Sequence, residues 1–491
     1  MKHVLLVLIV VGTACTSEKQ IDYFGQAAPQ STAVPFAPGL ITSDGNEHSA
    51  VAFAPDGSSV LWTVMDKNYV GRLYEMTYSN GAWSKPAMPS FADTVSNYFA
   101  PTFSADGKTL LFNSRMKADG LRTGRGNRIW SVERTESGWG KPVPFDTLVS
   151  KGDEFALSVA NSGALYFSSA SKSVGTSLNI LMTTKTNGQY SDPALLPYNI
   201  NTPAYEDGPY ISPDESYLVF ESTRPDGIGG SHDLYVSFRN DKGEWELPVN
   251  LGPGVNSDAM ERFPRVTPDG KYLIFASNRD QSATRPGFDM YWVDAKVISD
   301  LKRPGKAIDP NNGILHESDS AKLEQSLKKW LSENPANTDG LLLYSSLLRK
   351  QKRFEEAEKL VDGSNLLMET ALVKYGLDKN EEAEHILRPW LLDGPNLRHH
   401  YLELTNALYD MSEFDVSDAY FEKAMAIEPV GVWYYNRACG YAHKGETDRV
   451  FMHLNKAADN GYNSKRQYES DTDLAGVRSD RRYRELLKKL L

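Results

Sequence analysis

The chain has 491 residues, about three times the usual length of one domain, so we expect more than one domain. Hydrophobic residues make up 40% of it and charged residues 24%, and 53 basic against 64 acidic side chains give a net charge of -11. This composition excludes a polytopic membrane protein, a collagen and a wholly disordered chain, and the acidic balance argues against nucleic acid as a partner, because nucleic-acid binders neutralise phosphates with basic side chains.

The first residues predict export. A basic start, Lys2-His3, is followed by the apolar run Val4–Val11 and then by a polar stretch that begins at Thr16. Eight apolar residues are too few to cross a bilayer, whose hydrocarbon core is about 30 Å thick. We therefore interpret residues 1–14 as a signal peptide and not as a transmembrane helix.

The end of this segment, Gly12-Thr13-Ala14-Cys15, resembles the lipobox of bacterial lipoprotein precursors, although its first residue stands where the family usually carries Leu. The resemblance implies that Cys15 carries lipid and that residues 15–20 form a tether. Thr16 replaces the Asp that commonly retains lipoproteins at the inner membrane, which implies an anchor in the outer membrane, facing the periplasm or the exterior. Ordinary signal-peptidase cleavage just before the Cys is the alternative.

The middle of the chain repeats one hairpin about every 53 residues. Each copy places a Pro-Asp-Gly turn, or a variant of it, between two short apolar strands. Pro fixes φ, Asp bonds its own backbone and Gly can adopt a positive φ, which is the chemistry of a tight hairpin turn. The five turns are Phe53–Gly57, Phe103–Gly107, Val159–Gly163, Ile211–Glu215 and Val266–Gly270.

Each repeat continues with a third strand, and a fourth strand is predicted where an aromatic residue precedes a Pro by three positions. These pairs are Trp83 and Pro86, Trp139 and Pro142, Tyr190 and Pro193, and Trp245 and Pro248. Four antiparallel strands make a propeller blade. The fifth repeat lacks a fourth strand, so we expect the segment Ala33–Phe36 to supply it and close the ring. We predict an all-β propeller over residues 21–297 with five blades, a sixth degenerate blade being the alternative.

These turns, with the tracts Phe275–Arg279 and Gly287–Tyr291, resemble the WD40-like repeat of TolB-like periplasmic proteins. The third repeat departs from the pattern because Asn161-Ser162-Gly163 replaces Pro-Asp-Gly. The resemblance implies a propeller that holds a protein partner at the cell envelope.

A ring of candidate ligand-binding residues lies eight positions before each turn Asp or its equivalent. The ring consists of His48, Tyr98, Glu154, Glu206 and Glu261, with Glu47, Asp153 and Asp207 beside them. At the start of the innermost strands these side chains would converge near the mouth of the central channel, where they could bind a cation, an amine or a basic peptide end. The alternative is structural: each Glu bonds a neighbouring blade or pairs with Arg115, Arg224 or Arg279.

From Ala321 onward Pro and Gly become sparse and apolar residues recur at spacings of three and four, which predicts an all-α domain over residues 320–491. Residues 298–319 are interpreted as a linker. One unit resembles a tetratricopeptide repeat, with Tyr401, Leu404, Thr405, Leu408, Ser417, Phe421, Ala424 and Pro429 at the repeat's positions of small and large residues. The resemblance implies a multidomain protein whose C-terminal solenoid has a groove for extended peptides or helices.

The sequence contains no catalytic motif of the nucleophile-elbow, zinc-protease or phosphate-loop type. His48 and His232 alone are too few for a histidine-based metal site in the propeller, and Cys439 occupies a small-residue core position where we expect it to be inert. We predict a non-catalytic envelope lipoprotein without cofactor or metal, whose partners are envelope proteins or peptides and whose contact with the membrane is the lipid anchor alone.

The alternative is a propeller enzyme or sensor that acts on glycans, peptides or a cation at the acidic channel. It would need paired carboxylates, such as Glu206 with Asp207, or Glu154 with Glu261 across the ring.

Overall fold

The computed structural model describes residues 21–66, 70–94, 96–116, 127–136, 138–150, 154–169, 178–197, 200–202, 204–224, 227–228, 232–246, 248–280, 287–302, 320–333, 335, 338–391 and 397–490. The predicted signal peptide, the tether with Cys15 and most of the predicted linker lie outside the described residues.

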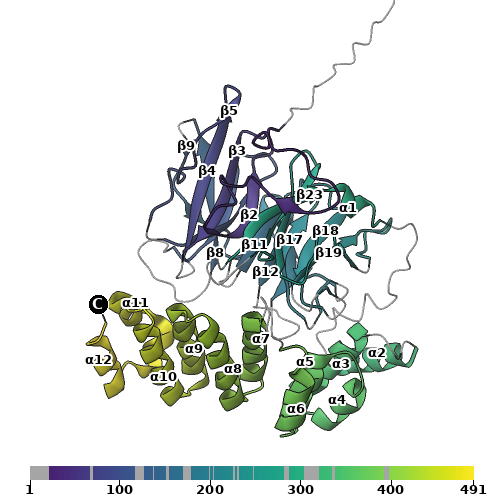
Figure 1. Cartoon of the computed structure of the whole chain (residues 1–491), viewed down its shortest axis with the longest axis vertical. Coiled ribbons are helices and arrows are strands. Elements are labelled where there is room, and N and C mark those ends of the chain that lie inside the picture. Colours follow the sequence, from purple (N-terminus) through teal and green to yellow (C-terminus); the bar gives the residue numbers. More distant parts are fainter. Residues whose placement is uncertain are drawn as a thin grey trace, which may run out of the picture.

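The first part of the chain is a five-bladed β-propeller in the described residues, each blade being built on three antiparallel strands (Figure 1). The strands are β2 (Asn46–Phe53), β3 (Ser59–Met65) and β4 (Gly71–Ser79); β6 (Tyr98–Phe103), β7 (Thr109–Ser114) and β8 (Arg128–Thr135); β11 (Glu154–Val159), β12 (Leu165–Ser169) and β13 (Asn179–Thr183); β17 (Glu206–Ile211), β18 (Tyr217–Ser222) and β19 (Asp233–Phe238); and β21 (Glu261–Val266), β22 (Tyr272–Ser277) and β23 (Asp289–Asp294). The innermost strand of each blade contacts those of both neighbours, and β21 contacts β2. The ring therefore closes with five blades and leaves no place for a sixth.

In the second, third and fourth blades, the outermost strand begins directly after the predicted Pro. These short strands are β10 (Val143–Pro144), β16 (Ala194–Leu195) and β20 (Val249–Asn250), and in the first blade a single bridge joins Glu75 to Ala87. The aromatic residue lies before the Pro, in short pairings such as β5 (Ala82–Trp83), β9 (Gly138–Trp139) and the hairpin of β14 (Lys185–Thr186) with β15 (Gln189–Tyr190). The prediction of one strand carrying both residues was therefore wrong. Pro has no N–H to donate, so it separates the two pairings.

The N-terminal segment supplies the outermost strand of the fifth blade, which confirms the predicted closure. Strand β1 (Val34–Pro35) pairs antiparallel with β23, Val34 lying opposite Trp292. The next residue continues the contact, because the Phe36 N–H donates to the carbonyl of Met290 at 2.7 Å. The Phe36 side chain is fully buried.

The hairpin turns have the predicted chemistry. The Asp56 carboxylate accepts the N–H of Ser58 at 2.9 Å, and Gly57 has φ +69°. Glu215 takes the glycine position of the fourth turn with φ 60°. Its carboxylate accepts the hydroxyls of Ser162 at 2.6 Å and Tyr166 at 2.7 Å, so contacts to the third blade accompany this costly backbone conformation.

The rest of the chain is helical. A short helix, α1 (Lys296–Ser299), follows the fifth blade and buries Ile298 against it, so the first residues of the predicted linker pack on the propeller. The described residues after the linker form α2 (Ser320–Glu333), α3 (Thr338–Lys350), α4 (Phe354–Val361), α5 (Leu367–Gly376), α6 (Asn380–Leu387), α7 (Leu397–Asp410), α8 (Phe414–Ile427), α9 (Gly431–Lys444), α10 (Thr447–Asp459), α11 (Lys465–Ser470) and α12 (Arg481–Leu487). Consecutive helices pack in pairs, α3 with α4, α5 with α6, α7 with α8 and α9 with α10, and the pairs follow one another in a row (Figure 1).

Small side chains let these helices approach closely. Ala424, Ala438, Cys439 and Ala457 are completely buried between α8, α9 and α10, and large residues such as Phe421 fill the remaining space. None of the helices in the described part of the chain has the length and apolar character that crossing a membrane requires.

Candidate functional site

Four of the five predicted ring residues are the first residues of innermost strands. Tyr98, Glu154, Glu206 and Glu261 begin β6, β11, β17 and β21, and all four are buried. Each lies opposite a serine of the second strand, as Glu206 does with Ser222 and Glu261 with Ser277. The repeat thus places the three glutamates in the same environment in three blades.

The Glu261 carboxylate is fully occupied by its own blade and the segment that leads into it. It accepts the N–H and the hydroxyl of Ser257 at 2.9 and 2.7 Å, and the hydroxyl of Ser277 at 2.8 Å. Arg279 completes the set, because its Nη2 lies 2.9 Å from Oε1 of Glu261. The arginine also donates to the carbonyl of Val255, so the group fixes the connection that enters the fifth blade.

Glu206 repeats this arrangement in the fourth blade. Its carboxylate accepts the N–H and hydroxyl of Thr202 at 2.9 and 2.5 Å and the hydroxyl of Ser222 at 3.0 Å, and Nη2 of Arg224 lies 3.6 Å away. Burial raises the pKa of Glu206 to about 8, and Arg224 and Thr202 oppose this rise. In the third blade, Glu154 accepts the hydroxyl of Ser150 at 3.3 Å. These contacts are those of the structural alternative, and ligand binding by the ring stays a prediction.

In the first blade, Glu47 takes this place instead of the predicted His48. The hydroxyl of Ser43, four residues earlier, donates to Oε1 of Glu47 at 2.6 Å, as Ser257 does to Glu261. Strand β2 has two register shifts where the other innermost strands have one, so a count of eight residues back from the turn misses by one position. The recurring signal is a Ser or Thr four residues before the Glu.

Glu47 differs from Glu206 and Glu261 because no arginine pairs with it among the described residues. Its Oε2 has no hydrogen-bond partner there, and the residue is fully buried. The pKa of Glu47 is raised to about 7, mainly by burial; the hydrogen bond from Ser43 opposes this rise and the nearby Asp289 carboxylate adds to it.

The remaining ring residues do not join the glutamates. The Tyr98 hydroxyl accepts the N–H of Asp93 at 3.1 Å while the ring packs against Phe91 and Phe112. The His48 ring lies 5.3 Å from that of Phe263, centroid to centroid. Burial and the Arg262 charge lower the pKa of His48 to about 3, so this imidazole is neutral at physiological pH.

Asp207 belongs to a separate ionic group between the fourth and fifth blades. Arg262 of β21 lies between two carboxylates of the fourth blade, with Nη2 at 2.7 Å from Glu221 and 3.3 Å from Asp207. The Tyr205 hydroxyl donates to Asp207 at 2.8 Å. Adjacent strand residues point to opposite faces, so Glu206 and Asp207 bind different arginines, Arg224 and Arg262. No local sequence pattern predicts this group, because Arg262 and Glu221 are 41 residues apart.

Among the described residues, one set of side chains could present metal ligands within reach of each other: Cys439, Asp471 and Asp473. Asp471 accepts the Tyr435 hydroxyl at 2.7 Å and the N–H of Asp473 at 2.9 Å, where it caps the short 3-10 helix Thr472–Val477. Cys439 is completely buried between helices. These contacts have a structural explanation, and we assign no metal to them.

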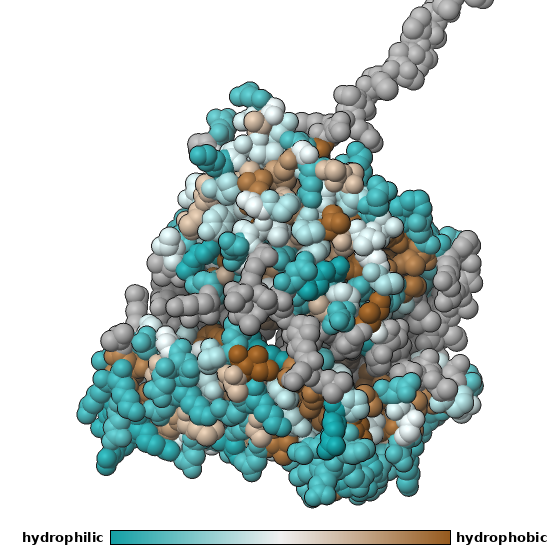
Figure 2. Space-filling model, viewed as in Figure 1, coloured by the Kyte–Doolittle hydropathy of each residue, from teal (hydrophilic) through white to brown (hydrophobic). Residues whose placement is uncertain are grey.

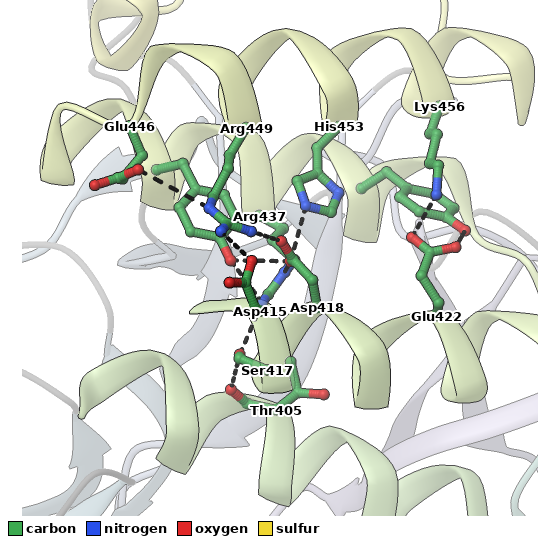
Figure 3. A network of polar contacts seen from close by, with 12 residues as sticks. Thr405, Asp415, Ser417, Asp418, Glu422, Arg437, Glu446, Arg449, His453 and Lys456 are labelled. Atoms are coloured by element: carbon green, nitrogen blue, oxygen red, sulfur yellow. Dashed lines mark hydrogen bonds and ion pairs between the residues drawn. The ribbon is translucent and has the colours of Figure 1, made fainter. Parts of the chain in front are cut away.

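A buried polar network ties α8, α9 and α10 together (Figure 3). The Asp418 carboxylate accepts Nε of Arg437 at 2.7 Å and the Tyr441 hydroxyl at 2.9 Å, and Nε2 of His453 lies 3.0 Å away. Arg449 of α10 also pairs with Asp418. Hydrogen bonds from His453 and Arg437, together with their charges, hold the pKa of Asp418 well below its usual range against the effect of burial. No local sequence pattern marks this network, because its members lie on three different helices.

No known protein family matches the sequence, and no curated protein resembles it significantly. Among solved structures, a putative TolB from Agrobacterium tumefaciens is 18% identical with a TM-score of 0.31, the match covering 47% of this chain and 69% of that one. TolB from Acinetobacter baumannii is 19% identical with a TM-score of 0.30, covering 50% and 53%. A periplasmic gluconolactonase from Pseudomonas aeruginosa is 13% identical with a TM-score of 0.30, covering 47% and 64%. Because TolB proteins and an enzyme match at the same level, the comparison assigns no activity.

Proposed function

We propose that this protein is a non-catalytic lipoprotein of the bacterial envelope that acts as a scaffold for protein or peptide partners. The observation that carries the proposal is the use of the ring glutamates. Glu206 and Glu261 accept hydrogen bonds from Ser and Thr side chains of their own blades and pair with Arg224 and Arg279. Carboxylates held in this way stabilise the ring, and they are poorly placed to act as acid and base on a substrate.

The helical part supplies a second surface in this proposal. We assign its helix pairs to the tetratricopeptide type, and the complete burial of Ala424, Ala438 and Ala457 at the expected small-residue positions supports the assignment. Such arrays bind extended peptides or helices in a concave groove. Asn406 of α7 and Asn436 of α9, in the first helices of two successive pairs, are exposed and 30 residues apart.

Hydrophilic residues cover most of the helices on the face seen in Figure 2. A polar surface of this kind favours partners held by hydrogen bonds and charges, as in reversible complexes. The lipid anchor at Cys15 would keep both surfaces at the membrane.

Site-specific photo-cross-linking in native cells tests the proposal. The full chain would carry a photoreactive residue at Asn406, at Ala105 on an exposed hairpin turn of the propeller, or at Met452 of α10, which is 40% exposed and serves as the control. The scaffold proposal predicts a discrete protein adduct at Asn406 or Ala105 that is absent at Met452. Equal labelling at the three positions would contradict it.

A further inference from the structure

A cavity of about 270 Å³ occupies the end of the central channel where the innermost strands run into their hairpin turns. All five blades line it, through Phe53, Phe103, Asn161, Tyr210 and Arg265 in chain order. Its volume is close to the lower limit for small-molecule sites, which are usually concave and mostly apolar with a few polar groups. This end of the channel is separate from the ring glutamates, which begin the same strands.

Arg265 brings a positive charge to this cavity. Its side chain is only 7% exposed and extends across the channel from the fifth blade. Nη1 donates to the carbonyls of Pro209 and Pro264, each at 2.9 Å, and Nη2 donates to the carbonyl of Leu157. The arginine is thus fixed by backbone of the third, fourth and fifth blades.

No carboxylate in the described part of the chain forms a close ion pair with Arg265, and Asp207 attracts its charge only from farther away. The other three buried arginines each have a carboxylate partner: Arg224 pairs with Glu206, Arg349 with Glu369 and Arg437 with Asp418. An unpaired buried charge is costly, so proteins seldom keep one without a use for it. Burial lowers the pKa of Arg265 to about 10, which still leaves the guanidinium charged at neutral pH.

The guanidinium has N–H groups that the bonds to carbonyls do not use. It carries five N–H groups, of which three take part in the bonds to carbonyls, and Nε is buried without a partner among the described residues. Nε has no exposed surface, so the remaining Nη2–H is the donor left for an oxygen of an anion in the cavity.

The residues that line the cavity indicate the chemistry of the ligand beyond its anionic group. Phe53, Phe103 and Tyr210 offer aromatic surface, while Thr102, Ser104 and Asn161 offer a few polar groups. A single negative charge is cheaper to transfer into such surroundings than the double charge of a phosphate. The cavity thus suits a small, singly charged ligand with an apolar body.

We propose that this cavity is a binding site for a carboxylate with an apolar or aromatic substituent, held by the charge and the remaining Nη2–H of Arg265. A free organic acid and the C-terminal carboxylate of a peptide present the same chemistry. The site does not depend on the scaffold function, because a cavity of this size can take a metabolite as readily as a chain end.

Calorimetric titration of the full chain tests the site. The probes are 3-phenylpropionate, its amide, 2-phenylethylphosphonate, and N-acetyl-Gly-Gly-Phe with a free or an amidated C-terminus. We expect 3-phenylpropionate or the free-acid peptide to bind at least about 10-fold more tightly than the matching amide. If the free-acid peptide binds more tightly than 3-phenylpropionate, the natural ligand is the C-terminus of a peptide. If 3-phenylpropionate binds more tightly, it is a small organic acid. Tighter binding of the phosphonate, or no difference between acid and amide, would overturn the proposal.

Three substitutions locate the binding. Arg265→Lys keeps the charge but replaces the planar guanidinium, which three backbone carbonyls hold in place, by a flexible ammonium, and should weaken carboxylate binding by at least about 10-fold. Ala105→Trp narrows the rim of the cavity without changing Arg265 and should also weaken carboxylate binding. Lys108 is exposed close to the same turn but lies outside the cavity, so Lys108→Trp should leave the affinity unchanged. If Arg265→Lys does not fold, the comparison of Ala105→Trp with Lys108→Trp tests the site. Unchanged affinity in Ala105→Trp would contradict the site. Loss of cross-linked partners would leave these titrations unaffected, so the two proposals can fail separately.

Discussion

Glu47 is the ring carboxylate whose protonation should affect stability most clearly, because it is fully buried and has no arginine partner among the described residues. Its folded pKa of about 7 lies above the ordinary value of 4.5. The folded protein therefore keeps a proton that the unfolded chain has lost, and the free energy of unfolding should fall as the pH rises from about 4.5 to 7.

Glu47→Gln should remove this dependence. Relative to the wild type, the loss of unfolding free energy between pH 5 and pH 8 should be smaller by about 2 to 3 kcal/mol, since one pKa unit corresponds to about 1.4 kcal/mol. Urea denaturation at both pH values measures it. Glu244→Gln, on an exposed turn, is the control and should follow the wild type. The same pH dependence in Glu47→Gln and the wild type would refute the assignment.

Strand β1 shows how one element closes the ring. Phe36 follows it directly and is fully buried, with its ring 5.1 Å from Trp292 of the fifth blade and 6.3 Å from Phe53 of the first. Phe36→Ala should lower the unfolding free energy by about 3 to 5 kcal/mol, because it opens a cavity where the first and last blades meet.

Val34→Ala is the matched control for this prediction, since Val34 lies in the same strand but is 39% exposed. We expect a change of less than about 1 kcal/mol, again measured by urea denaturation. If Phe36→Ala lowered the unfolding free energy no more than Val34→Ala does, the closure of the ring by the N-terminal segment would contribute little to stability.

Among the helices, Asp418 should contribute most to the stability of the packing between α8, α9 and α10. Asp418→Asn would leave Arg437 and Arg449 without their shared carboxylate, at a cost of about 3 to 5 kcal/mol. Asp415→Asn is the control, because Asp415 also pairs with Arg449 but its side chain is 94% exposed. Loss of helical circular dichroism on heating would report the difference, and equal midpoints would contradict the role of the network.

The Asp418 network also has a predicted pH dependence. Because the folded pKa of Asp418 is depressed, its contribution is present above the unfolded value of 3.8 and should be lost as the pH falls below it. Asp418→Asn should not show this additional loss in acid.

At the scale of the whole molecule, turn chemistry made the propeller predictable. Asp56 and Gly57 form the expected turn, and the substitution of Glu215 for glycine changes the contacts of a turn and not its place in the chain. The same regular spacing predicted the wrong ring residue in the first blade. An additional irregularity in β2 puts Glu47, and not His48, at the position of the ring glutamates. A spacing rule cannot register a bulge, because the residue that a bulge adds is not marked by composition.

Contacts between blades and between helices were out of reach for a different reason. Arg262 meets Glu221 and Asp207, and Arg265 reaches the carbonyl of Leu157, 108 residues away, only because the ring brings the innermost strands together. Their partners are set by the geometry of closure, which no local pattern encodes. The helix pairs were predicted from small residues such as Ala438, but the Asp418 network that joins them was not.

Thermal unfolding of the full chain, with and without millimolar Ca²⁺, Mg²⁺ or Zn²⁺, tests most directly whether the ring glutamates stabilise the propeller or bind a ligand. The structural account predicts that none of these cations shifts the midpoint of the wild type. It also predicts that Glu261→Gln lowers the midpoint by several degrees, because the pairing with Arg279 is lost. A cation that raises the midpoint of the wild type but not that of Glu261→Gln would contradict the account and establish the acidic ring as a binding site.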